Sequence, residues 1–67
     1  MDYQPSTADR LLITDEASEM MRTPVATLAY WRHVGTGPRS AKIGRRVVYR
    51  ESDVRAWLDA QFNDVPA

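Results

Sequence analysis

The chain has 67 residues and no cysteine; 43% of its residues are hydrophobic and 27% are charged. This composition is ordinary for one folded domain, and it excludes a disulfide framework or a thiolate metal site. No apolar run approaches the roughly 20 residues that span a bilayer, and no export signal is visible at the acidic amino terminus. We therefore expect a cytoplasmic domain whose stability rests on apolar packing.

Charge is unevenly distributed along the chain, although the formal net charge is zero. Residues 20–50 contain no acidic residue, whereas both flanking segments are acidic. The basic residues of this segment are Arg22, Arg32, Arg39, Lys42, Arg45, Arg46 and Arg50. If the fold keeps the segment on one side, it presents a positive surface to a polyanion, and double-stranded DNA is the first partner to expect.

The two ends of the chain lack apolar periodicity. Residues 1–10 are expected to form a flexible tail, and residues 63–67 a second, shorter tail. Order is expected to begin at the apolar run Leu11-Leu12-Ile13, which places one folded domain over residues 11–62.

A first helix is expected over residues 15–22. Thr14 can cap it by accepting a bond from a backbone N–H, and Asp15 and Glu16 in the first turn complement the positive end of the helix dipole. Three side chains share one face and are expected in the core: Ala17, Met20 and Met21.

Thr23-Pro24 predicts the start of a second helix, because threonine is a good cap and proline suits the first helical position. Pro24 also disfavours helical geometry at Thr23, so the two helices are expected to meet at a tight corner. The second helix is expected to run to His33 or Val34 and to end at Gly35, a common C-terminal stop.

The second helix has two different sides. The expected core side consists of Val25, Leu28, Trp31 and the stem of Arg32. The opposite side carries small and hydrogen-bonding side chains and no carboxylate; it consists of Ala26, Tyr30 and His33, with Thr27 and Ala29 at its margins.

A turn cluster at residues 35–38 is followed by a predicted hairpin. Residues 41–43 and 47–49 favour strands, and Gly44-Arg45-Arg46 joins them with arginines at an outward-projecting tip. Tyr49 alternates toward the core.

A third helix is expected to begin at Ser52 or, with less support, at Glu51 as the cap, with Asp53 in its first turn. Its inner side is expected to hold Val54, Trp57, Leu58 and Phe62. Because Trp31 and Trp57 lie within apolar stripes, they are interpreted as core residues rather than as platforms for nucleic-acid bases.

Two short helices, a basic hairpin and a closing helix follow the order of a winged helix-turn-helix domain. Over residues 11–62 the sequence resembles the small phage-type excisionases and their relatives in the MerR-like winged-helix group. Three blocks carry the resemblance in order and at family-like spacing: TPVATLAYWRHVGTGP (residues 23–38), KIGRRVVYR (residues 42–50) and SDVRAWL (residues 52–58). The expected fold class is therefore mainly α with a small β-hairpin, in a winged helix-turn-helix DNA-binding arrangement.

The resemblance implies that the second helix enters the major groove and that the hairpin, or wing, reaches the neighbouring minor groove or backbone. The recognition-helix residues it implies are Thr23, Ala26, Thr27, Tyr30 and His33. The wing and backbone contacts it implies are Arg22, Arg32, Arg39, Lys42, Arg45, Arg46 and Arg50. Many family members carry arginine or another long polar residue near Ala29, and the alanine here leaves more of the recognition to groove shape and deformability.

Plainer interpretations stay open for several of these residues. His33 can be an exposed helix-end imidazole, Tyr30 can pack against the wing, and Arg32 can reach solvent from an apolar stem. Arg45 and Arg46 can be a hydrated hairpin end without a partner.

The chain offers one histidine, no cysteine and no glycine-rich phosphate loop, so we expect no enzymatic activity, metal or cofactor. The resemblance implies a sequence-preferring DNA-binding protein that favours excision in integrase-mediated recombination, bending attachment-site DNA or lining it with neighbouring copies. Two alternatives stay open: a phage or prophage transcriptional regulator of the same fold, and an adaptor whose acidic flanks dock on a basic partner protein. We expect a monomer that associates on DNA in a bacterial host.

Overall fold

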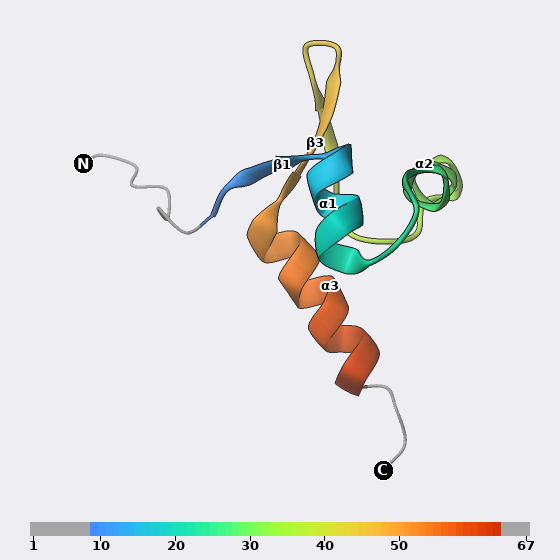
Figure 1. The fold of residues 1–67 in the computed structure, drawn as a ribbon, viewed down its shortest axis with the longest axis vertical. Helices are drawn as coiled ribbons and strands as arrows, with labels where there is room; N and C mark the ends of the chain where they lie inside the picture. The colour runs from blue at the N-terminus through green and yellow to red at the C-terminus, as the bar shows by residue number, and fades with distance from the viewer. Residues whose placement is uncertain (1–8, 64–67) are drawn as a thin grey trace, which may run out of the picture.

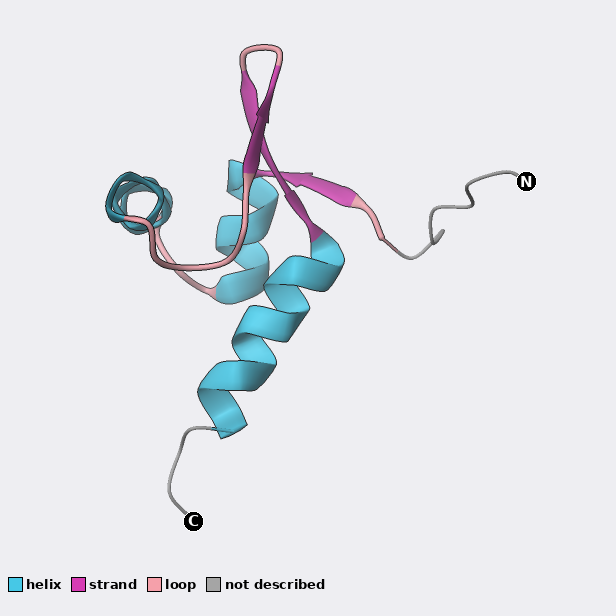
Figure 2. Ribbon diagram, turned by 180° about the vertical axis from the view of Figure 1, so that it is seen from behind, coloured by secondary structure: helices cyan, strands magenta, loops and turns pink. Residues whose placement is uncertain are grey.

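The computed structural model describes residues 9–63. Within them the chain forms β1 (Leu11–Ile13), α1 (Thr14–Met21), α2 (Val25–Val34), β2 (Ala41–Ile43), β3 (Arg46–Arg50) and α3 (Glu51–Asn63). The strands make one antiparallel sheet in the order β1-β3-β2, and the hairpin of β2 and β3 stands out from the body (Figures 1 and 2). This arrangement confirms the expected fold class.

The strand β1 is the element that the sequence did not predict. It pairs with β3, with Leu12 opposite Tyr49 and Ile13 opposite Val48. The backbone N–H of Glu51 donates to the Arg10 carbonyl at 2.8 Å, which continues the pairing beyond the strand. A run of three apolar residues carries no alternation of its own, so only the distant partner strand makes this segment a strand.

The expected tail at residues 1–10 divides at this point. Residues 1–8 lie outside the described part of the chain, as do residues 64–67 of the second tail. Asp9 and Arg10 are described and contact the fold, since Asp9 Oδ1 accepts a bond of 3.0 Å from the backbone N–H of Ser52. Asn63 belongs to α3.

The expected cap of α1 was wrong. Ile13 occupies the cap position and Thr14 is the first helical residue, because β1 runs directly into the helix. The Ile13 side chain has no group that can accept a bond; instead Glu16 Oε1 accepts from the backbone N–H of Ile13 at 2.9 Å. A carboxylate in the first turn thus stabilises the helix start in place of the threonine.

The caps of α2 and α3 were also wrong. Pro24 is the cap residue of α2, and the hydroxyl of Thr23 donates backward to the Met21 carbonyl at 2.9 Å. The helix α3 begins at Glu51 directly after β3, so Ser52 lies inside the first turn and the oxygen that meets its N–H comes from Asp9. Helix ends depend on neighbouring segments that no local pattern reveals.

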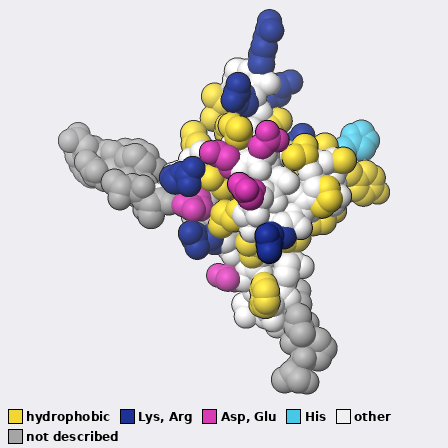
Figure 3. Space-filling view, in the orientation of Figure 1, with side chains coloured by type: hydrophobic (Ala, Val, Ile, Leu, Met, Phe, Trp, Pro, Cys, Tyr) yellow, Lys and Arg dark blue, Asp and Glu magenta, His cyan; other side chains and the backbone are white. Residues whose placement is uncertain are grey.

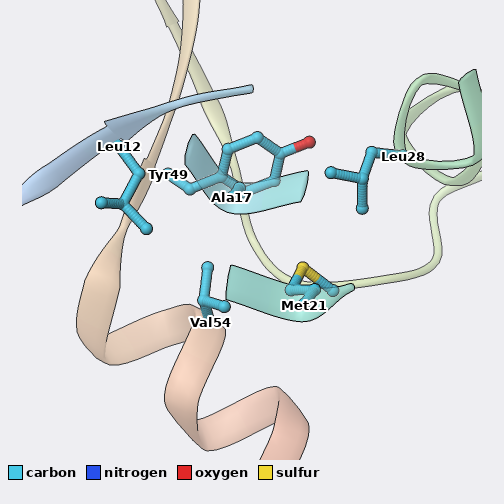
Figure 4. Packing of buried hydrophobic residues seen from close by; sticks show 6 residues of the cluster. All are labelled: Leu12, Ala17, Met21, Leu28, Tyr49 and Val54. Carbon is cyan, nitrogen blue, oxygen red and sulfur yellow. The ribbon is translucent and has the colours of Figure 1, made fainter. Parts of the chain in front are cut away.

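The core draws on every element except β2. Its buried side chains are Leu12, Ala17, Met21, Leu28, Tyr49 and Val54 (Figure 4). Met20, Trp31, Val47, Trp57 and Leu58 pack against them, and the rings of Trp31 and Trp57 lie 5.2 Å apart at 42°. The core placement of both tryptophans is confirmed.

Two residues expected in the core are exposed. Val25 is 43% exposed in the first turn of α2, and Phe62 is 77% exposed near the end of α3, which extends past the core (Figure 1). Helical periodicity places both on the inner side, but no other described element covers that side at these two points.

Candidate nucleic-acid interface

The corner between α1 and α2 positions the start of the second helix. Arg22 ends α1 in the left-handed conformation, with φ 55°, which is uncommon for a residue other than glycine. The backbone N–H of Thr23 donates to the Ser18 carbonyl at 3.0 Å, and the Ser18 hydroxyl donates to the Thr23 carbonyl. These bonds hold the start of α2 against α1 and leave Arg22 exposed beside it.

The amino-terminal end of α2 is suited to a phosphate. No side chain caps it, so the free backbone N–H groups of the first turn have no side-chain acceptor among the described residues. Such groups, together with the helix dipole, favour an anion. Arg22 adds a full positive charge at the same end.

The outer side of α2 is open to solvent. Tyr30 is 62% exposed and Val34 is 50% exposed, whereas Leu28 on the inner side is 1% exposed. Ala26, Ala29 and His33 are also exposed, and Thr27 is half-buried. The structure thus brings Ala26, Thr27, Tyr30 and His33 onto one side of the helix, whereas Thr23 precedes the helix and is half-buried.

The hairpin turn is tighter than expected. Arg46 lies in β3 opposite Ile43, so only Gly44 and Arg45 form the turn and the expected three-residue tip was wrong. Gly44 has φ 64° and Arg45 does not have a positive φ, as in the type II′ turn that suits the twist of two paired strands. The side chain of Arg45 therefore occupies the tip, and that of Arg46 a strand position.

The two faces of the hairpin carry different basic residues. Tyr49 and Val47 pack on the core side of the sheet, and Lys42 is paired with Val47 and shares that side. Successive residues of a strand alternate sides, so Arg46 lies on the opposite side. Lys42 faces the side of α2 and Arg46 faces away from it.

Arg32 connects α2 to the base of the hairpin. Its Nη1 donates to the hydroxyl of buried Tyr49 at 2.9 Å (Figure 4 shows this hydroxyl directed toward α2). Arg32 is half-buried, so the structure places it between the two proposed DNA-contacting elements and not on their outer surface. The sequence predicted Tyr49 only as a core residue, and the role of its hydroxyl as the acceptor for Arg32 was not predicted.

The remaining basic residues differ in whether a carboxylate lies within salt-bridge distance. Arg50 Nε forms a 2.9 Å salt bridge with Asp53, which ties the end of β3 to α3. No carboxylate of the described residues pairs with the exposed side chains of Arg22, Arg39, Lys42, Arg45 and Arg46. Figure 3 shows Lys and Arg at the hairpin and hydrophobic side chains with histidine over α2, whereas Asp and Glu lie over the body together with further Lys and Arg.

No group of three or more His, Cys, Asp or Glu side chains that could hold a metal ion occurs in residues 9–63. In the same range, no helix is long and apolar enough to cross a membrane.

Comparison with known protein families gives a match over most of the chain. The sequence model of the family described as helix-turn-helix domain matches residues 11–61, from β1 into the last turns of α3. No curated protein and no solved structure matches the chain. The matched family includes excisionase-like DNA-binding proteins and supports the binding of double-stranded DNA. The chain belongs to the helix-turn-helix domain family.

Proposed function

We propose that this chain is an excisionase-like architectural factor, which binds attachment-site DNA beside a phage integrase and favours excision over integration. The observation that carries the proposal is the joint presentation of two elements within a helix-turn-helix domain. One is α2, which has no side-chain cap and an outer side open to solvent. The other is a hairpin whose Lys and Arg side chains have no carboxylate partner among the described residues. Such a surface holds and shapes DNA and needs no catalytic group.

The geometry suggests how both elements engage one duplex. An α-helix fits the major groove, and the amino-terminal end of α2 with Arg22 would meet a phosphate at its edge. The hairpin would then reach the neighbouring minor groove or backbone with Lys42 and Arg45. The bond between Arg32 and Tyr49 links α2 to the hairpin, and we propose that the DNA bends to meet both elements.

The exposed acidic residues of α1 suit a basic protein partner. Asp15 and Glu19 are exposed on α1, where phosphate would be repelled. We assign this side to integrase or to a neighbouring copy on the DNA, with a monomer in solution. Binding of a basic protein at this side without DNA would instead support an adaptor.

The salt dependence of binding tests the DNA contact. Four or five phosphate contacts from the basic residues without a carboxylate partner give a slope of log K against log salt of about −3.6 to −4.5. The measurement is a gel shift of the full chain on random duplex and on candidate attachment-site DNA at several salt concentrations. A salt-independent result, or no complex, would leave only the adaptor.

An excision reaction tests the finer role. Purified integrase and an attachment-site substrate are mixed with and without the full chain, and excised product is measured. The proposal expects product to depend on the chain and to fall with a Tyr30→Ala variant, which alters preference among sites. A promoter response without any effect on excision would favour the transcriptional regulator of the same fold.

A further inference from the structure

The outer side of α2 is apolar for a surface that faces DNA. Its exposed residues are Ala26, Ala29, Tyr30, His33 and Val34, and of these only Tyr30 and His33 carry a hydrogen-bonding group. The helix contains no Lys, Asp, Glu, Asn or Gln, and its one arginine, Arg32, is turned inward to Tyr49. The long polar side chains that usually read bases are therefore missing from this side.

Base chemistry narrows what such a side can read. Guanine is read by arginine or lysine and adenine by asparagine or glutamine, through paired hydrogen bonds in the major groove. The apolar group of that groove is the 5-methyl of thymine, which alanine and other apolar side chains contact. We propose that α2 recognises its site through thymine methyl groups, contacted by Ala26 and Ala29 and flanked by Tyr30.

This inference rests on the proposed DNA-binding function and specifies its target as a thymine-containing half-site. An exposed apolar helix can also dock a protein. Here the surroundings favour DNA, because exposed Arg22 precedes the helix, exposed Arg39 follows it, and neither has a carboxylate partner among residues 9–63. The small side chains of Ala26 and Ala29 also let the helix backbone approach the floor of the groove.

The experiment begins with the full chain and a duplex library that has a randomised centre. Bound duplexes are selected, and each thymine of the selected site is then replaced singly by deoxyuridine, which lacks only the methyl group. Each contacted thymine should lose about fourfold in affinity, the value of one buried methyl-sized group. Two such losses within one run of neighbouring base pairs should multiply to roughly 16-fold.

Variants assign the methyl contacts to α2. In Ala26→Gly or Ala29→Gly, the ratio of the deoxyuridine and thymine dissociation constants should fall from about four toward one at one position. Because this ratio is taken within one variant, any cost of glycine to folding cancels. Ala56→Gly is the matched control, since Ala56 is an exposed helical alanine of α3, and it should keep the ratio of the unchanged chain.

The outcomes separate the inference from the proposed function. Salt-dependent binding with no position sensitive to deoxyuridine would overturn thymine reading while DNA binding stands. Sensitivity that Ala26→Gly and Ala29→Gly leave unchanged would also overturn it, because the methyl groups would then act through DNA shape. Absence of any salt-dependent complex would remove the proposed function together with the inference.

Discussion

The two elements proposed to face DNA differ in their side chains. The outer side of α2 is apolar, with Tyr30 and Val34 more exposed than most apolar side chains, while the hairpin carries Lys42, Arg45 and Arg46. Charge contributes affinity on any sequence, whereas contact with base edges discriminates among sequences. Under the proposed function, the hairpin would hold the duplex and α2 would select the site.

The largest expected effect concerns the inner side of α2. Leu28→Ala removes a side chain that is 1% exposed, and it should cost about 2 to 5 kcal/mol of unfolding free energy. A domain of this size has little more than that, so the variant should unfold at a much lower urea concentration. Urea unfolding followed by circular dichroism measures the loss. Val34 of the same helix is 50% exposed, and the unfolding free energy of Val34→Ala should stay within about 0.5 kcal/mol of that of the unchanged chain.

Substitution of the basic residues of the hairpin should have the next largest effect, on DNA affinity. Lys42→Ala combined with Arg45→Ala should flatten the salt slope by about 1.8 and weaken binding roughly 30-fold at 0.15 M salt, on all sequences alike. Arg45→Ala combined with Arg46→Ala should flatten it by only about 0.9, because Arg46 lies on the far side of the sheet. Equal slopes for the two pairs would show that both sides of the hairpin meet phosphate, and an unchanged slope would remove the hairpin from the interface.

Loss of the bond between Arg32 on α2 and Tyr49 on β3 should lower stability less than loss of the Leu28 side chain. Tyr49→Phe keeps the buried ring and removes the acceptor of the Arg32 bond, at a cost of about 1.5 kcal/mol. Binding should weaken as well, since the angle between α2 and the hairpin loses a constraint. Tyr30→Phe removes an exposed hydroxyl and is the control for stability in the same unfolding measurement. Equal stability of both variants would mean that the Arg32 bond fixes nothing.

The smallest expected effect lies away from DNA, at the start of α3. The bond from the Ser52 backbone N–H lowers the pKa of Asp9 below its usual value of 3.8. A lowered pKa means that the folded chain favours the ionised carboxylate. Its contribution to stability is thus complete above the unfolded pKa and disappears as the pH falls through the folded pKa. NMR titration of Asp9 measures the shift, and Asp9→Asn should remove this part of the acid dependence while Asp59→Asn should not.

Local periodicity was enough to predict the three helices, the hairpin and most of the core. The spacing of Leu28 and Trp31 identified the inner side of α2, and Gly35 marked its end. Val25 follows the same period and is nevertheless exposed, because burial depends on which neighbour covers a position and not on the position alone.

The features that were not predicted depend on contacts between distant segments. The strand β1 exists because β3 pairs with it, and α3 is completed by Asp9 from the other end of the domain. The bond between Arg32 and the Tyr49 hydroxyl was not predicted, because the two residues are distant in the sequence. The side occupied by Arg46 followed only once the register placed it in β3.

Placement of α2 and the hairpin on one duplex is tested most directly by tethered DNA cleavage. The chain has no cysteine, so single variants Val34→Cys on α2, Arg45→Cys on the hairpin and Ala60→Cys on α3 can each carry a cleaving group. The first two should cut a selected duplex within about one helical turn of each other, from the major and the minor groove, and the third should not cut. Cuts from α3, or cuts from α2 and the hairpin at unrelated positions, would contradict the account.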